Sequence, residues 1–223
     1  GFFGFYASQQ VAKAVASRER IQERLDWVAT EQTLLFLIAI NEQKAGGLQV
    51  QDNQKRTSSF LQLDGSFYQG LGNVRFSLND YYGLVGVNAI PNFQLNKLLE
   101  SFERNKRTRM VLLDTLYDYI DLDELKRLHG RESAGYLAAG TATSANDFLK
   151  SPFELNSVHG WRNWLEEHPG FEVDAWLSSS WRSRVNINTI PEELVPKILP
   201  LSKIEAGILV KARREKPFRE MED

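Results

Sequence analysis

A stretch of 37 residues without glycine or proline, from Ser8 to Lys44, constrains the fold of this chain more than any other feature. Within it apolar residues recur at spacings of three and four, the pattern of an amphipathic helix, and Gly46 and Gly47 follow as a stop signal. At about 1.5 Å per residue this helix would be roughly 55 Å long, longer than a small domain is wide. We therefore predict one long helix, part of which protrudes from its own domain.

The two halves of the predicted helix differ in their apolar pattern. The first half carries a narrow apolar stripe among charged residues, which suits contact with a neighbouring helix. The second half contains Leu34–Ile40, seven consecutive apolar residues that we expect to be enclosed on several sides. Seven residues are far fewer than the roughly 18–20 that a helix needs to cross a bilayer. The residues expected to contact a partner helix are Val11, Val15, Ile21, Leu25 and Val28.

After the long helix the apolar period drops to two. Val74, Phe76 and Leu78 alternate with polar residues, as in a strand with one buried face. The turn signals between such segments, for example Asp64-Gly65, are too short for helical crossovers, so the sheet should be an antiparallel meander. With the long helix lying across it, this sheet completes a first domain at residues 1–87.

From residue 88 onward the sequence predicts only helices. Start signals are frequent, such as Ser151-Pro152, where a capping side chain precedes a proline in the first turn. We therefore predict a second, helical domain at residues 88–223, and an α+β chain as a whole. The expected helices cover residues 92–102, 109–120, 132–138, 151–158, 160–167, 191–198 and 202–214.

Two segments of the second domain resemble each other. Val87–Pro91 and Val185–Pro191 each place an asparagine in a short extended piece ahead of a helix that starts with proline. A duplicated helical-hairpin unit and the chance recurrence of a common helix-start phrase both account for this similarity.

Charge and composition narrow the classes of function. Twenty-seven Lys and Arg against 29 Asp and Glu give a formal charge of −2, so no overall field attracts nucleic acid. The absence of cysteine excludes disulfides, thiolate zinc sites and a cysteine nucleophile. The serines 178–180 with His159 or His168 are the only candidates for a nucleophile and base, and no spacing links them. We predict that the chain is not an enzyme.

An acidic segment, residues 114–132, concentrates oxygen ligands at the end of a predicted helix. Asp118, Asp121, Asp123 and Glu124 lie close in sequence, and Glu132 follows Gly130. Calcium takes six to eight oxygen ligands and tolerates irregular loops, although the spacing is not that of an EF-hand. A calcium site and a solvated acidic helix end are both compatible with this pattern.

Residues 185–218 have the layout of a helix-hairpin-helix unit, which in DNA-binding versions holds a phosphate at a glycine-containing hairpin. Here the hairpin is Leu199-Pro200-Leu201-Ser202, which lacks glycine and offers one N–H fewer. From residue 182 to 223 nine basic and seven acidic residues give a net charge of only +2. A helix-hairpin-helix DNA-binding protein remains the alternative function.

Five phrases, in this order along the chain, resemble the large minor pseudopilin of type II secretion, the general secretion pathway protein K family. Together with the long N-terminal helix they cover nearly the whole sequence. The phrases are residues 79–88 (NDYYGLVGVN), 113–123 (LDTLYDYIDLD), 130–132 with Tyr136, 151–161 (SPFELNSVHGW), and 185–191 with Arg213, Arg214, Pro217 and Phe218.

The resemblance implies a pseudopilin fold, a long helix on an antiparallel sheet, with a large helical domain inserted in it. It also implies a non-enzymatic tip subunit of the type II secretion pseudopilus that starts assembly with two other minor pseudopilins for protein export. The implied location is the bacterial inner membrane, with a single N-terminal span and this part in the periplasm. The resemblance implies no nucleic-acid partner and no membrane contact other than that span.

The family resemblance carries over further expectations. By position, its calcium maps to Asp118, Asp121, Asp123 and Glu132. Family members begin with a leader and a hydrophobic span, so we expect such a span ahead of Gly1. They also return to a final strand after the helical insert, whereas this sequence stops shortly after Phe218. Either that strand is missing from the sequence or the sheet is one strand short.

Overall fold

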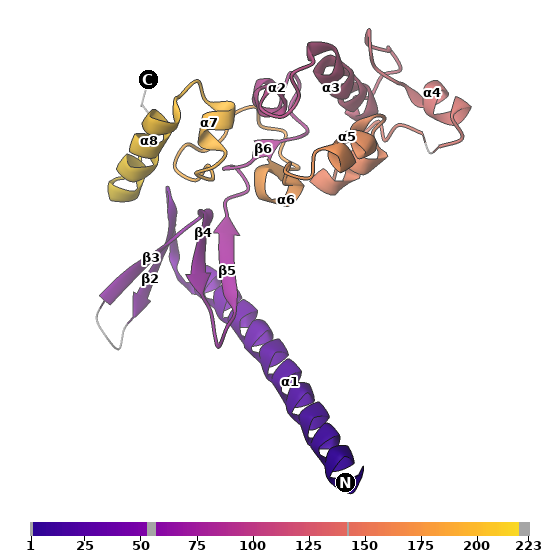
Figure 1. Cartoon of the computed structure of the whole chain (residues 1–223). Coiled ribbons are helices and arrows are strands. Elements are labelled where there is room, and N and C mark those ends of the chain that lie inside the picture. The colour runs from indigo at the N-terminus through magenta and orange to yellow at the C-terminus, as the bar shows by residue number, and fades with distance from the viewer. Residues whose placement is uncertain (1, 53–56, 142, 219–223) are drawn as a thin grey trace. The chain divides into compact units, whose positions relative to one another are not determined.

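The computed structural model describes residues 2–52, 57–141 and 143–218, and divides the chain into two compact units, Gly1–Leu78 and Asn79–Asp223 (Figure 1). The predicted α+β class is confirmed. The sequence placed the division after Val87, whereas the structure places it after Leu78. The reason is that Val85 and Val87 are completely buried in the apolar core of the second unit.

The first unit begins with the long helix α1, Phe2–Ile40, which confirms the single long helix (Figure 1). It ends four residues before the predicted end at Lys44, because residues Glu42–Lys44 form a strand instead. The side chains of residues 1–8 lie outside the described part. Among the described helices, none combines the length and apolar character that a bilayer crossing requires.

The strands of the first unit form two sheets where the sequence predicted one meander. Strand β2 (Gly47–Asp52) pairs antiparallel with β1 (Glu42–Lys44) on one side and with β3 (Thr57–Gln62) on the other. Strands β4 (Asp64–Gln69) and β5 (Arg75–Asn79) form a second, two-stranded sheet. The meander is interrupted at Asp64, whose carboxylate accepts hydrogen bonds from the backbone N–H and the hydroxyl of Ser66.

Helix α1 packs on the loop between β4 and β5 through close backbone approach. The hydroxyl of Thr30 accepts a hydrogen bond from the N–H of Leu71 at 3.0 Å. A Cβ at Gly70 would lie 2.7 Å from Thr30, and a Cβ at Gly72, where φ is +54°, would lie 2.2 Å from a carboxylate oxygen of Asp26. Glycine is therefore required at both positions.

The exposure of the first half of α1 agrees with the sequence prediction, whereas the exposure of the second half does not. Every described side chain from residue 9 to 25 is exposed, which confirms that this half protrudes. In Leu34–Ile40 only Leu34 and Leu37 are half-buried, whereas Leu35, Phe36 and Ile38 are exposed. The expected enclosure on several sides is wrong, because two small sheets cover one side of a helix only.

The second unit is built mainly from short helices, close to the predicted positions. The sequence predicted no strand after residue 87, yet β7 (Leu177–Ser178) forms a short parallel pair with β6 (Val85–Gly86). A Cβ at Gly86 would lie 2.4 Å from the carbonyl oxygen of Ser180, so glycine permits this pairing. The helices are α2 (Phe93–Glu100), α3 (Lys106–Ile120), α4 (Ser133–Ala138), the 3₁₀ helix η1 (Pro152–Ser157), α5 (Trp161–Glu167), α6 (Val173–Trp176), α7 (Val195–Ile198) and α8 (Lys203–Glu215).

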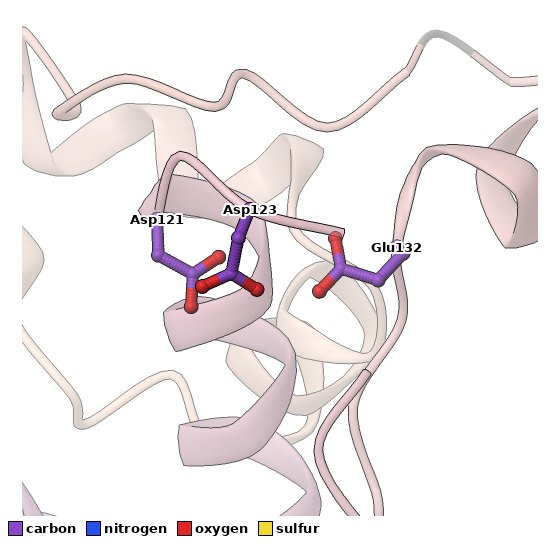
Figure 2. Close-up of side chains that lie close together, drawn as sticks. All are labelled: Asp121, Asp123 and Glu132. Atoms are coloured by element: carbon purple, nitrogen blue, oxygen red, sulfur yellow. The ribbon is translucent and has the colours of Figure 1, made fainter. Parts of the chain in front are cut away.

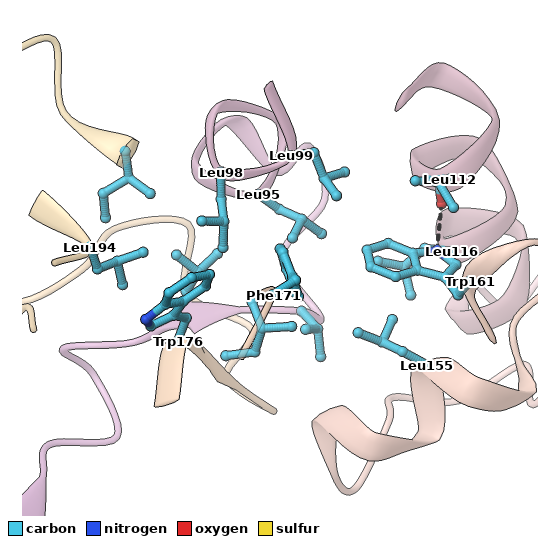
Figure 3. Close-up of a cluster of buried hydrophobic side chains, with 14 of the residues drawn as sticks. Leu95, Leu98, Leu99, Leu112, Leu116, Leu155, Trp161, Phe171, Trp176 and Leu194 are labelled. Atoms are coloured by element: carbon cyan, nitrogen blue, oxygen red, sulfur yellow. Dashed lines mark hydrogen bonds between the residues drawn. The ribbon is translucent and has the colours of Figure 1, made fainter. Parts of the chain in front are cut away.

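A continuous apolar core holds these helices together (Figure 3). Leu95 and Leu98 of α2 and Leu116 of α3 are completely buried in it. Trp161 at the start of α5 is also completely buried, and its indole N–H donates a hydrogen bond to the carbonyl of Leu112 at 2.8 Å. The second unit therefore has a core of its own, of the kind that stabilises an independent domain.

The two similar asparagine segments make the same interaction. Asn88, three residues before Pro91, accepts a hydrogen bond from the N–H of Leu149 and donates one to its carbonyl, both at 2.9 Å. Asn188, three residues before Pro191, does the same with Phe218, at 2.7 and 2.9 Å. The segments thus share a two-point backbone interaction as well as a sequence pattern.

Candidate functional site

The end of α3 and the start of α4 bring three of the predicted calcium ligands together. Helix α3 ends at Ile120, the chain becomes extended at Asp121, and α4 begins directly after Glu132. One carboxylate oxygen each from Asp121, Asp123 and Glu132 lie within 4.8 Å of one another. Figure 2 shows the three carboxylates around a common space. We call these three residues the carboxylate cluster.

Two members of the carboxylate cluster have oxygens without a hydrogen-bond partner. Glu132 is only 6% exposed, and neither of its carboxylate oxygens accepts a hydrogen bond from the described residues. One oxygen of Asp121 is also buried and without a partner. Burial and then the charges of Asp118 and Asp121 raise the pKa of Glu132 to about 7. Because buried carboxylates without partners are costly, and because hard oxygen donors suit calcium, these residues fit a bound calcium ion.

Asp118, the fourth predicted ligand, has a protein partner. It is completely buried, and its carboxylate accepts hydrogen bonds from the guanidinium of Arg127 at 2.8 Å and from the backbone N–H of Arg127 at 3.1 Å. A Cβ at Gly130 would lie 1.9 Å from this carboxylate, so only glycine permits the approach. The guanidinium also contacts Asp121. Asp118 and Arg127 therefore hold the loop after α3 in place.

Glu124, which the sequence grouped with these acids, braces the same loop. Its carboxylate accepts hydrogen bonds from the hydroxyl of Ser133 at 2.7 Å and from the amide of Asn146 at 2.9 Å. The sequence identified neither Arg127 nor Asn146, since both act through loop contacts that have no regular spacing. The segment also contains Lys126 and Arg131, so no signal in the sequence singled out Arg127.

The predicted partner-binding residues of α1 lie at the surface. Val11, Val15, Ile21, Leu25 and Val28 are between 40 and 63% exposed. At 100° per residue they lie on one stripe about 140° wide. We call this stripe the α1 face. It is an apolar surface suited to a second helix.

The hairpin before α8 does not offer the phosphate seat of the DNA-binding alternative. Ser202 and Glu205 form a capping box, in which the Ser202 hydroxyl accepts from the N–H of Glu205 at 3.3 Å and the Glu205 carboxylate accepts from the N–H of Ser202 at 2.8 Å. These hydrogen bonds lower the pKa of Glu205. A carboxylate therefore stands at the helix end where a phosphate would have to bind.

The histidines considered for catalysis have other partners. His159 lies 3.0 Å from the guanidinium of Arg131, and burial lowers its pKa. The ring of His168 bonds the carbonyl of Trp164 at 2.7 Å. Ser178 and Ser180 are buried. The structure therefore does not bring together the nucleophile and base that the sequence left open.

Of the comparisons with known proteins, only the one with solved structures gave a match. No protein-family model matches the chain, and no curated protein does. Among solved structures, the chain is similar to a chain of the GspK-GspI-GspJ complex from the type 2 secretion system of enterotoxigenic Escherichia coli. That similarity has a TM-score of 0.49 at 20% identity and covers 86% of this chain and 68% of the other.

Proposed function

We propose that this protein is a minor pseudopilin of type II secretion that binds other minor pseudopilins through the α1 face. The observation that carries this proposal is the protruding half of α1, whose apolar side chains have no cover within the described part of the chain. Burial of apolar area contributes about 25 cal/mol per Å², so a neighbouring helix on this stripe is strongly favoured. The sequence resemblance to a minor pseudopilin suggests that this neighbouring helix belongs to another minor pseudopilin.

The second unit accounts for a position at the tip of the pseudopilus. In the proposed assembly, pseudopilins pack through their N-terminal helices, and a subunit that carries a large helical unit leaves no room for another above it. The protein would then start assembly and would itself take no part in a chemical reaction. In this proposal the described residues lie in the periplasm, and an N-terminal span holds the protein in the inner membrane.

Co-purification with two partner minor pseudopilins tests this proposal. We expect Val15→Asp and Leu25→Asp to remove the partners, because a carboxylate on the α1 face cannot be buried against a helix without a large penalty. Ala16→Asp is the matched control, since Ala16 is exposed on the opposite side of the same helix. Unchanged co-purification of Val15→Asp and Leu25→Asp would contradict the proposal, as would binding of duplex DNA that weakens with salt.

We also propose that the carboxylate cluster holds calcium. When bound, the ion would supply positive charge to the unpartnered oxygens of Glu132 and Asp121 and would tie the loop after α3 to the start of α4. Asp118 and Arg127 position the loop. A ligand that binds only the folded state raises its stability, by about 2.7 kcal/mol at a hundredfold excess over Kd.

The melting temperature with calcium and with chelator tests the calcium proposal. We expect calcium to raise it in the wild-type protein and to leave Glu132→Gln unchanged. Asp147→Asn is the control, because Asp147 is an exposed acid paired with Lys150 and should leave the calcium effect intact. Equal melting temperatures with calcium and chelator in the wild-type protein would contradict the site.

A further inference from the structure

The loop after α3 presents an unusual set of leucines. Leu122, Leu125 and Leu128 are 85, 79 and 83% exposed, and they are the three most exposed large apolar side chains of the described residues. Single exposed leucines are ordinary, but three within seven residues form a cluster. We call these residues the leucine loop.

The leucine loop is held in place by its polar residues. Arg127 pairs with Asp118, and Glu124 accepts hydrogen bonds from Ser133. His129 bonds Asp114 through both its backbone N–H and its ring, each at 3.2 Å. The polar side chains thus anchor the loop to the unit while the leucines between them remain exposed. Their exposure is therefore part of the folded conformation and does not come from a frayed end.

The leucine loop and the carboxylate cluster are one structural feature. Leu122 lies between Asp121 and Asp123 in the chain, so an ion held by the cluster is adjacent to exposed leucine. Residues 118–132 carry five acidic and three basic side chains, and the charge of one calcium ion equals the difference. Lys126, between Leu125 and Arg127, is exposed. One calcium ion would therefore cancel the net negative charge of this segment, and with it the segment's repulsion of an anionic surface.

We propose that the leucine loop docks on an anionic phospholipid surface when the carboxylate cluster holds calcium. The proposal rests on the calcium site proposed above. Three carboxylates fill only part of the six to eight oxygen positions of calcium, so phosphate oxygens of the lipid complete them. The leucines enter the apolar boundary of the bilayer, and Lys126 stays among the headgroups.

A bilayer fits this surface better than a second protein does. A stable protein interface uses about 800 Å² and 20–30 residues on each partner, and three leucines on one loop fall far short of that. Leucine side chains entering a bilayer need no complementary groove. This contact is additional to the N-terminal span that the family resemblance implies.

Co-sedimentation with vesicles tests the inference. The probes are vesicles of phosphatidylcholine with phosphatidylglycerol, and vesicles of phosphatidylcholine alone, each with calcium and with chelator. We expect binding only to the anionic vesicles with calcium. Leu125→Ser should weaken it about tenfold, and the triple change of Leu122, Leu125 and Leu128 to serine should abolish it. Ile204→Ser is the control, because Ile204 is nearly as exposed but lies on α8.

The outcomes separate this inference from the proposals it follows. If calcium raises the melting temperature but no vesicles bind, only the docking inference is overturned. If the serine variants bind vesicles as the wild-type protein does, or neutral vesicles bind equally well, it is also overturned. If calcium changes neither melting nor vesicle binding, both the site and the docking fail. Leucine-dependent binding of partner pseudopilins without vesicles would show that the loop is a protein interface and would contradict the inference.

Discussion

The two units of this protein bury their apolar residues in opposite ways. Among the described side chains, Leu48 is the only buried apolar residue of the first unit, and all the others belong to the second. The second unit encloses aromatic residues such as Trp161 and Trp176 in its own core, whereas α1 presents its apolar residues to solvent. The second unit thus has the core of an independent domain, whereas in the proposed function the first unit buries its apolar residues against neighbouring helices.

Trp161→Ala should give the largest change in stability. Removing a completely buried indole and its hydrogen bond should cost the second unit about 3–5 kcal/mol. Denaturant unfolding followed by near-ultraviolet circular dichroism measures it. Phe153→Ala, at an exposed site, should change stability by less than about 0.5 kcal/mol. Similar losses for the two variants would mean that the second unit lacks the core described here.

The pH dependence of stability should reveal the buried Glu132. Its pKa is about 7 in the folded state against an ordinary value of 4.5, so the folded state holds the proton more tightly. With chelator, the contribution of Glu132 to the free energy of unfolding should therefore be largest below pH 4.5 and fall by about 3 kcal/mol as pH rises to about 7. Unfolding curves across this range measure it.

Calcium and a single substitution sharpen that measurement. Glu132→Gln should remove this fall in stability between pH 4.5 and 7, and calcium should reduce it in the wild-type protein, since the ion favours the charged form. Asp147→Asn should leave it unchanged. A stability difference between the wild-type protein and Glu132→Gln that stays constant over this range would show that Glu132 is not held as described.

The paired asparagines should give intermediate effects. Asn88→Ala leaves the buried backbone N–H and carbonyl of Leu149 without partners, at a cost of about 2–3 kcal/mol. Asn188→Ala should destabilise the second unit in the same direction through Phe218. Asn156→Ala, at an exposed position with one local hydrogen bond, should cost less than about 0.5 kcal/mol. Equal losses of stability for Asn88→Ala and Asn156→Ala would contradict a structural role for the asparagine segments.

The α1 face should show the smallest effect on the isolated protein. Val15→Asp and Leu25→Asp change exposed side chains, so each should alter the free energy of unfolding by less than about 0.5 kcal/mol. Thermal melting measures this. Trp161→Ala should lower the free energy of unfolding far more than these variants do, because residues that act only in binding do not stabilise the isolated protein. A large loss of stability would mean that the α1 face is packed within the monomer.

Sequence reasoning succeeded where local chemistry decides the structure. The helix cap at Ser151, the alternation in β5 and the long α1 follow from neighbouring residues alone. The β6–β7 pair was missed, because it joins segments about 90 residues apart. The exposure of Phe36 was also missed, since apolar runs predict burial without saying whether the same chain supplies the cover.

The candidate site shows the same limit. The acidic pattern predicted the residues that meet, and the structure brings Asp121, Asp123 and Glu132 together. The acidic pattern did not predict that Arg127 would bind the carboxylate of Asp118, because a loop contact between residues nine apart has no periodicity. Which carboxylate has a protein partner and which has none is decided by packing, and only the structure shows it.

Protection of a single thiol on α1 tests the account most directly. The chain contains no cysteine, so Leu25→Cys provides the only thiol. We predict that it reacts rapidly with a maleimide in the isolated protein and is protected when the partner minor pseudopilins are present. Phe153→Cys, on the second unit, should react at the same rate in both states. Equal labelling of Leu25→Cys with and without the partners would contradict the claim that the α1 face is the assembly surface.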